Sequence, residues 1–189
     1  AYAPAGCEAL FEGVVAHGTP LLLADGSPPL PPRVRGFGRA LLHALQSALA
    51  LGYGSACLLN SDSPTLPTDF LRRAGAALAA PGDRVVLGPA EDGGYYLLGA
   101  KAAQAHLFED IDWSTAWVAD QTRDRARTLG LDVCELPSWY DVDDCAGLHR
   151  LVTELDAPAN GAQGAYAAPA TASCVRRLGL TQPLTSRRA

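Results

Sequence analysis

The chain has 189 residues, of which 48% are hydrophobic, and its formal net charge is -5 at pH 7. This length and composition predict one globular domain with room for a tail, and they exclude a globally disordered chain. The acidic charge argues against a general nucleic-acid partner, which needs a basic face, and no apolar run is long enough to cross a bilayer.

Predicted helices and strands alternate along the first half of the chain. Cys7 to Val15 is expected to form a short helix and Leu21 to Leu23 a short strand, before a Pro-rich loop. Leucines at helical spacing predict a helix from Phe37 to Leu51, and a buried strand from Ala56 to Leu59 follows. Thr68 is expected to cap the next helix, which runs to about Ala80.

The second half continues this alternation, with one exception. The strands Arg84–Leu87 and Tyr95–Leu98 flank a loop too short for a helical crossover, so we expect one antiparallel strand in a mostly parallel sheet. Ser114 is expected to cap a helix that reaches Thr128, and a strand from Asp132 to Leu136 follows. Asp143 or Asp144 opens a last helix through Leu155. This pattern predicts an α/β sheet covered on both faces.

The two ends of the chain differ from its centre. After Leu155 the composition turns to Ala, Gly and Pro without a period, so we predict a domain over residues 1–155 and a flexible tail over 156–189. A short ordered piece is expected near Cys174 to Leu180. Ala1-Tyr2-Ala3 resembles the end of a strand whose beginning is missing, so we expect the domain to be incomplete at its N-terminus.

The five cysteines are odd in number and none forms a CxxC pair. They therefore support neither a disulfide framework nor a zinc site, and they suit a reducing, cytoplasmic setting. Cys57 and Cys134 stand in apolar runs and are expected to be buried.

Two acidic segments are candidate metal sites. Asp62 follows a buried strand, and ligands of open α/β sheets bind beyond the carboxyl ends of strands. It is a candidate ligand for Mg²⁺ or Mn²⁺, although Asp, Ser and Pro in Asn60–Pro64 also suit an ordinary turn. Asp141 and Asp143 alternate with one residue between them, so in extended backbone both carboxylates point to one side. The alternative is that Asp143 or its neighbour only caps the last helix.

Two further segments are candidate substrate sites. Glu91 and Asp92 precede two glycines between two strands, and glycine lets a backbone approach a ligand closely. A plain hairpin loop with an Asp-Gly turn is the alternative. Ser114 and Thr115 can hydrogen-bond an anion at a helix N-terminus, or simply cap that helix.

Four runs together resemble a known family: Asn60–Pro67, Gly88–Gly99, Phe108–Thr115 and Trp139–Asp144. They resemble the bacterial GT-A-like transferases, often described as radical-SAM/selenodomain-associated transferases. These are similar to phospholactate and molybdenum-cofactor guanylyltransferases. The resemblance covers about residues 1–155. It implies a nucleotide-diphospho-sugar transferase fold, a three-layer α/β/α sandwich with a mostly parallel mixed sheet, here expected to lack the first strand and the basic nucleotide loop.

The resemblance also implies roles for individual residues. Asp62 matches the metal-binding Asp after the central strand, and Asp141 and Asp143 match a late acidic pair. Glu91 or Asp92 is the candidate base for an acceptor hydroxyl. The expected substrate-binding residues are Gly36, Gly38, Arg39, Ser61, Ser63, Gly93, Gly94, Trp113, Ser114 and Thr115.

The function implied is a metal-dependent glycosyltransferase that uses a nucleotide-diphospho-sugar and a small-molecule acceptor. One alternative is a nucleotidyltransferase that uses a nucleoside triphosphate and releases pyrophosphate. Another is a catalytically inactive, truncated domain with a binding role. The sequence leaves open the base, the sugar, the acceptor and whether the chain forms an oligomer, and it predicts neither a nucleic-acid nor a membrane partner.

Overall fold

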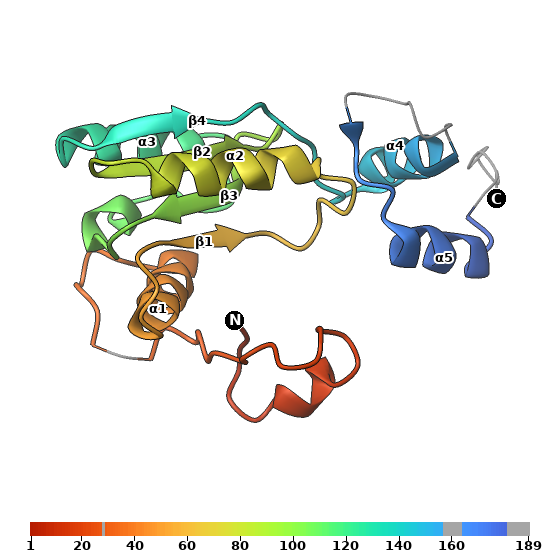
Figure 1. Ribbon diagram of the computed structural model, residues 1–189, viewed down its shortest axis with the longest axis horizontal. Coiled ribbons are helices and arrows are strands. Elements are labelled where there is room, and N and C mark those ends of the chain that lie inside the picture. Colours follow the sequence, from red (N-terminus) through yellow and green to blue (C-terminus); the bar gives the residue numbers. More distant parts are fainter. Residues whose placement is uncertain (28, 157–163, 181–189) are drawn as a thin grey trace.

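A four-stranded mixed sheet lies at the centre of the computed structural model, which describes residues 1–27, 29–156 and 164–180 (Figure 1). The strands are β1 (Ala56–Leu59), β2 (Arg84–Pro89), β3 (Tyr95–Ala100) and β4 (Asp132–Glu135), in the order β1-β3-β2-β4. β3 is antiparallel to both of its neighbours, whereas β2 and β4 are parallel. The predicted single antiparallel strand in a mostly parallel sheet is therefore confirmed.

One face of the sheet is covered by α1 (Phe37–Ala50), α3 (Val118–Thr128) and the 3₁₀ helix η2 (Ala105–Phe108). Leu42 and Leu45 of α1 share a buried cluster with Val85 and Leu87 of β2. These strand residues are two apart and so point to the same face.

The other face of the sheet is covered by α2 (Thr68–Ala79), which crosses the front of the sheet in Figure 1. Phe70 and Leu78 of this helix share a second buried cluster with Val86 of β2 and Leu97 of β3. Val86 lies between the two β2 residues that face α1, so alternation along the strand separates the two clusters. The three-layer α/β/α arrangement is confirmed.

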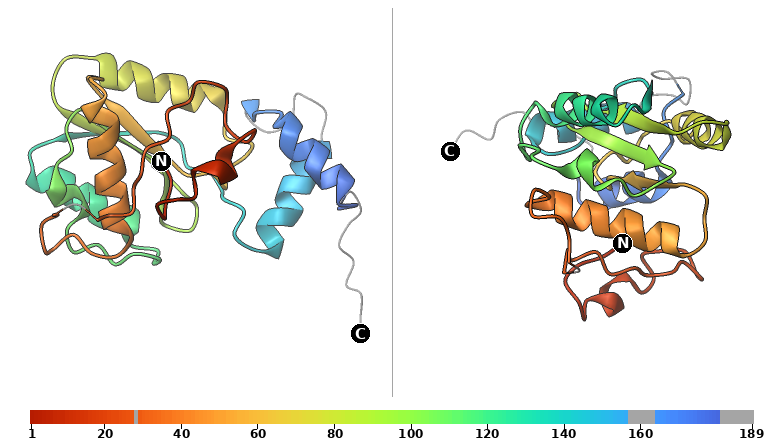
Figure 2. Two further views of the ribbon diagram at one scale, coloured as in Figure 1. Left: turned by 90° about the horizontal axis from the view of Figure 1, so that it is seen from below. Right: turned by 90° about the vertical axis from the view of Figure 1, so that its left-hand side faces the viewer.

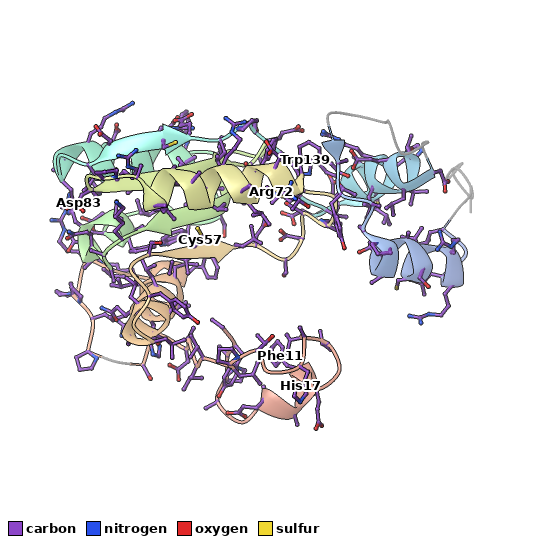
Figure 3. The ribbon with its side chains drawn as sticks, in the orientation of Figure 1. Phe11, His17, Cys57, Arg72, Asp83 and Trp139 are labelled. Carbon is purple, nitrogen blue, oxygen red and sulfur yellow. The ribbon has the colours of Figure 1, made fainter. Side chains whose placement is uncertain are left out.

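Two parts of the chain lie outside these layers. The N-terminal segment, with the 3₁₀ helix η1 (Glu8–Phe11), lies beneath α1 on the side away from the sheet (Figure 2). Phe11 and His17 mark this segment in Figure 3. The helices α4 (Cys145–Asp156) and α5 (Pro169–Arg177) lie beyond the ends of the strand arrows in Figure 1. Among the described residues, no helix is both long and apolar enough to cross a bilayer.

The tail predicted for residues 156–189 falls only partly within the described residues. Residues 157–163 and 181–189 lie outside them. In the described part, α5 spans Pro169–Arg177 and packs beside α4.

Several predicted element boundaries were wrong. The helix expected from Cys7 to Val15 is only the short turn η1, because none of its side chains is buried to stabilise a longer helix. The strand expected at Leu21–Leu23 is reduced to a single bridge between Leu23 and Tyr2. α2 begins at Thr68 itself, so this threonine is not its cap.

The start of α3 and the burial of Cys57 also differ from expectation. α3 begins at Val118, so the predicted cap, Ser114, does not lie next to its first residue. Ser114 also has a left-handed φ of 62°, whereas a capping residue has extended backbone. Cys57 is exposed because β1 is an edge strand. The predicted opening of α4 is confirmed for Asp144, whose Oδ1 accepts a hydrogen bond from the Gly147 backbone N–H at 2.7 Å.

Candidate functional site

The loops that follow three parallel strands meet at one edge of the sheet. β1, β2 and β4 run in the same direction, so their carboxyl ends lie together. The loop after β1 carries Asp62, the loop after β2 carries Asp92, and the segment after β4 carries Asp141 and Asp143. The backbone N–H of Val142 donates to the carbonyl of Asp62 at 3.0 Å, which ties the first and third of these segments together.

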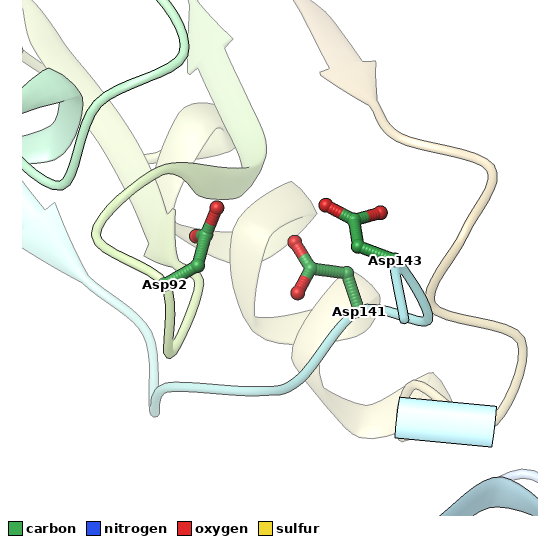
Figure 4. Close-up of side chains that lie close together, drawn as sticks. All are labelled: Asp92, Asp141 and Asp143. Atoms are coloured by element: carbon green, nitrogen blue, oxygen red, sulfur yellow. The ribbon is translucent and has the colours of Figure 1, made fainter. Parts of the chain in front are cut away.

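Three carboxylates converge at this edge. Oxygen atoms of Asp92, Asp141 and Asp143 all lie within 4.8 Å of one another. Figure 4 shows Asp141 and Asp143 on one short segment, with Asp92 across from them on another loop. Burial raises the pKa of Asp141, and the negative charges of Asp92, Asp143 and Asp62 raise it further. A bound cation would relieve this repulsion, and carboxylate oxygens are the ligands that Mg²⁺ and Mn²⁺ prefer.

The three carboxylates border a cavity of about 540 Å³. The residues predicted from the sequence that line it are Asp62, Asp92, Gly94, Trp113, Ser114, Thr115, Asp141 and Asp143. Its lining residues include no Lys, Arg or His among the part of the chain that the structure describes. The cavity is therefore strongly acidic, and a phosphate group can enter it favourably only together with a cation.

Glu91 is held outside this cavity by an ion pair. Arg150 of α4 donates from Nη1 to Oε2 of Glu91 at 2.6 Å and from Nη2 to Oε1 at 3.2 Å. The same guanidinium lies 3.9 Å from the centre of the Tyr140 ring. Glu91 thus fastens the loop that carries Asp92 to α4, and its carboxylate is already engaged.

Two glycines set the shape of that loop. Gly93 has a φ of +94°, and a Cβ at this position would lie 2.2 Å from the carbonyl oxygen of Ala116. Its own carbonyl accepts a hydrogen bond from the Ala119 backbone at 2.9 Å, so the loop docks on the start of α3. The Gly94 N–H donates to Oδ1 of Asp92 at 2.8 Å and orients that carboxylate.

The glycines before α1 adjoin the tryptophan that lines the cavity. A Cβ on Gly38 would lie 2.8 Å from the Trp113 ring, and one on Gly36 would lie 3.5 Å from it. Arg39 donates to the carbonyl of Gly26 at 2.7 Å and is not part of the cavity lining. The absence of side chains at Gly36 and Gly38 therefore lets the Trp113 ring pack against the start of α1.

The two serines beside Asp62 lie outside the cavity lining. Ser61 is exposed, whereas Ser63 is buried and donates to the carbonyl of Tyr140 at 2.9 Å. The Ser63 contact holds the loop after β1 against the segment that carries Asp141, which gives this serine a structural contact.

Comparison with known proteins places the chain in a bacterial family. Residues 11–115 match the sequence profile of a family described as "Uncharacterized protein conserved in bacteria (DUF2064)". The chain belongs to this family. The match includes Asp62 and Asp92 and ends before Asp141 and Asp143. No curated protein matches the sequence.

A solved structure is similar to this DUF2064 chain. It is that of a protein from Desulfovibrio desulfuricans G20 which carries the provisional name nucleotide-diphospho-sugar transferase. The two sequences are 30% identical, the TM-score is 0.60, and the match covers 76% of this chain. The chain spans 62% of the length of that protein. The expected nucleotide-diphospho-sugar transferase fold is confirmed by this similarity.

Five further residues line the cavity of this DUF2064 chain and were not among the site residues predicted from the sequence. They are Phe37, Asn60, Tyr95, Ala116 and Val118. Asn60 stands in the same loop as Asp62, which was a usable signal. Tyr95 faces the α1 side of the sheet and Tyr96 the α2 side, a choice that alternation alone leaves open. Phe37 lies at the start of α1, and nothing local distinguishes it from a core residue.

Proposed function

We propose that this chain is a metal-dependent transferase that acts on a nucleotide-diphospho-sugar, that is, a glycosyltransferase with a small-molecule acceptor. The observation that carries the proposal is the convergence of the Asp92, Asp141 and Asp143 carboxylates within 4.8 Å at the carboxyl edge of the sheet. The similarity to the D. desulfuricans protein, whose name states this substrate class, supports it.

In this proposal Asp92, Asp141 and Asp143 hold Mg²⁺ or Mn²⁺, and Asp62 is a fourth candidate ligand in the same cavity. These residues fit such an ion because all of them offer carboxylate oxygens and their mutual repulsion is largest when no cation is present. When bound, the cation neutralises the negative charge of the diphosphate leaving group. The acidic lining makes this neutralisation a requirement for donor binding.

The acceptor hydroxyl must lose a proton during transfer. Of the two candidate bases, Asp92 lines the cavity, whereas Glu91 is paired with Arg150. We assign Glu91 the role of fixing the loop and Asp92 the contact with the reacting groups. Asp92→Asn separates two uses of that carboxylate: lost Mn²⁺ affinity identifies a ligand, and lost turnover with unchanged Mn²⁺ affinity identifies a base.

The test of this function is binding and turnover with nucleotide sugars in the presence and absence of Mn²⁺. Calorimetry is expected to show binding of at least one nucleotide sugar that requires the metal and is lost in Asp141→Ala and Asp143→Ala. Asp132→Ala is the matched control, because it removes the same charge at the opposite end of β4. Release of a nucleoside diphosphate supports glycosyl transfer.

Two other results would point elsewhere. Pyrophosphate release from a nucleoside triphosphate would identify a nucleotidyltransferase, the reaction expected from the predicted kinship with guanylyltransferases. A complete lack of metal-dependent nucleotide binding would refute both enzymes and favour a domain with a binding role only.

A further inference from the structure

Helix α4 lies at the same edge of the sheet as the converging carboxylates, beyond the ends of the strand arrows in Figure 1. None of the three carboxylates belongs to this helix, and its buried residues are Leu151 and Val152. Three other residues of α4 are Gly147, Arg150 and Glu154, whose spacing of three and then four places them on one face of the helix. Each of them contacts a segment of the candidate site.

Gly147 allows the first turn of α4 to approach the segment that carries Asp141. A Cβ on this glycine would lie 2.9 Å from the carbonyl oxygen of Asp141 and 3.2 Å from the Cα of Val142. Both are backbone atoms, so a side chain at position 147 could be accommodated only if the helix and the segment moved apart. On its other side, the segment is bound to the loop after β1, because the Val142 N–H donates to the Asp62 carbonyl.

Arg150 joins α4 to the loop that carries Asp92. Its two hydrogen bonds to the Glu91 carboxylate hold the residue next to Asp92. The same guanidinium lies over the ring of Tyr140, which is the residue next to Asp141. One side chain of α4 therefore contacts the neighbours of two carboxylates that face each other across the site.

The hydroxyl of Tyr140 adds a third connection to α4. It donates to Oε2 of Glu154 and also hydrogen-bonds with the hydroxyl of Thr65 at 2.9 Å. Tyr140 and Thr65 are both buried, and Thr65 belongs to the loop after β1. Through these contacts α4 is linked to all three of the segments that bring acidic residues to the cavity.

Carboxylates that share a cation must be held together against their own repulsion, and the residues behind the ligands do this. In this chain, the contacts of α4 fall on the residues beside Asp92 and on the backbone of Asp141 itself. We infer that α4 is a positioning element for the cation site, and that Gly147 and Arg150 are its positioning residues. This inference rests on the proposed function and adds that a helix without a ligand sets the metal affinity.

The direction of one effect separates positioning from simple electrostatics. Arg150 is a cation, so its removal would strengthen Mn²⁺ binding if it acted only through its charge. If it positions the Asp92 loop, Arg150→Met should instead weaken Mn²⁺ binding by about tenfold, as loss of a residue behind a metal ligand typically does. The double variant Arg150→Met with Glu91→Gln keeps the net charge. Charge alone predicts wild-type affinity for it, whereas positioning predicts a loss similar to that of Arg150→Met.

Gly147→Ala tests the second contact and should also weaken Mn²⁺ binding by about tenfold, because its Cβ would displace the Asp141 segment. Gly75→Ala is the matched control, since Gly75 also lies within a helix and its Cβ would meet no atom within 4 Å. Arg127→Met with Asp124→Asn is the control for the ion pair, because both side chains are 68% exposed on α3. Calorimetry with Mn²⁺ alone measures the affinities, and thermal unfolding in a chelator shows that each variant is folded.

The possible outcomes separate this inference from the function on which it rests. If the wild-type protein binds no Mn²⁺, or binds it equally well after Asp141→Ala, the metal site and the inference are both overturned. If Asp141 is needed but Arg150→Met binds Mn²⁺ as tightly as the wild-type protein or more tightly, the metal site stands and the positioning role is overturned. Weaker binding by Arg150→Met and by the charge-neutral double variant, with both controls unchanged, supports the inference. The Arg150 variants decide alone if Gly147→Ala does not fold.

Discussion

Replacing Asp141 by Asn should stabilise the metal-free protein while weakening its affinity for Mn²⁺. The two effects have one cause, because Asp141 is half-buried and close to other carboxylates. Without a cation, folding brings like charges together and raises the pKa of Asp141. With a cation bound, the same charges become favourable. The substitution keeps the shape of the side chain and removes its charge.

The size of the stabilisation follows from the separation of the charges. Oxygens of Asp141 and Asp92 lie within 4.8 Å of each other, as do those of Asp141 and Asp143. Two unit charges this far apart repel by about 0.9 kcal/mol in water, and physiological salt reduces this by roughly half. Asp143 stays near Asp141 in the unfolded chain, so the repulsion that folding creates comes mainly from Asp92. We expect a gain of roughly 0.5–1 kcal/mol and a rise in Tm of about 1–4 °C.

Thermal unfolding in a chelator and again with Mn²⁺ measures both effects. Asp141→Asn should have a higher Tm than the wild-type protein in chelator, and its gain should shrink at high salt. The affinity of Asp141→Asn for Mn²⁺ should be at least about 100-fold lower than that of the wild-type protein. Loss of a residue that only hydrogen-bonds to a metal ligand typically lowers metal affinity by about 10- to 100-fold, and loss of a ligand should cost at least as much. Asp132→Asn should change neither quantity. A lower Tm in chelator, or unchanged Mn²⁺ affinity, would refute the reasoning.

Three further predictions follow from the site. Because the pKa of Asp141 is raised in the folded protein, ionisation of Asp141 destabilises the metal-free fold as the pH rises through that pKa. On acidification, Asp141 takes up its proton before the ordinary Asp pKa of about 3.9 is reached, so Mn²⁺ affinity should already fall above that pH. An equal pH dependence of Mn²⁺ affinity in Asp141→Asn would contradict this. Gly93→Ala should cost about 3 kcal/mol or more in urea unfolding, because its Cβ would meet Ala116, whereas Gly130→Ala, with positive φ but open space, should cost about 1 kcal/mol; equal costs would argue against the contact. Asp144→Ala should lose about 1 kcal/mol in the same assay through the cap of α4, and no loss would show that the cap is not formed.

Much of the fold could be predicted from local patterns in the sequence. The leucines of α1 and the apolar runs of β1 and β2 mark their elements because periodicity reflects which side of an element meets the core. The short connection between β2 and β3 was enough to predict the antiparallel strand. Predictions failed where no apolar face supports the element, as at residues 7–15, or where a backbone torsion such as that of Ser114 overrides a capping preference.

The candidate site was predictable only as a set of loops. Strand direction placed Asp62, Asp92 and the Asp141–Asp143 segment at one edge of the sheet, because the carboxyl ends of parallel strands lie together. Which carboxylates face one another depended on contacts between residues far apart in the sequence. In the tertiary structure Gly93 packs against the start of α3, and the Asp92 carboxylate lies close to that of Asp141. The Glu91 carboxylate binds Arg150 instead and lies outside the cavity.

The sequence by itself determined the order of the elements, the direction of the strands and the edge of the sheet at which the acidic loops lie, because these follow from local periodicity and chain length. The tertiary structure alone decided which side chains share the cavity. Within a loop, the direction of a side chain depends on the backbone torsions of the turn and on distant contacts, such as the one between Arg150 and Glu91. The spacing of neighbouring residues predicts neither of these.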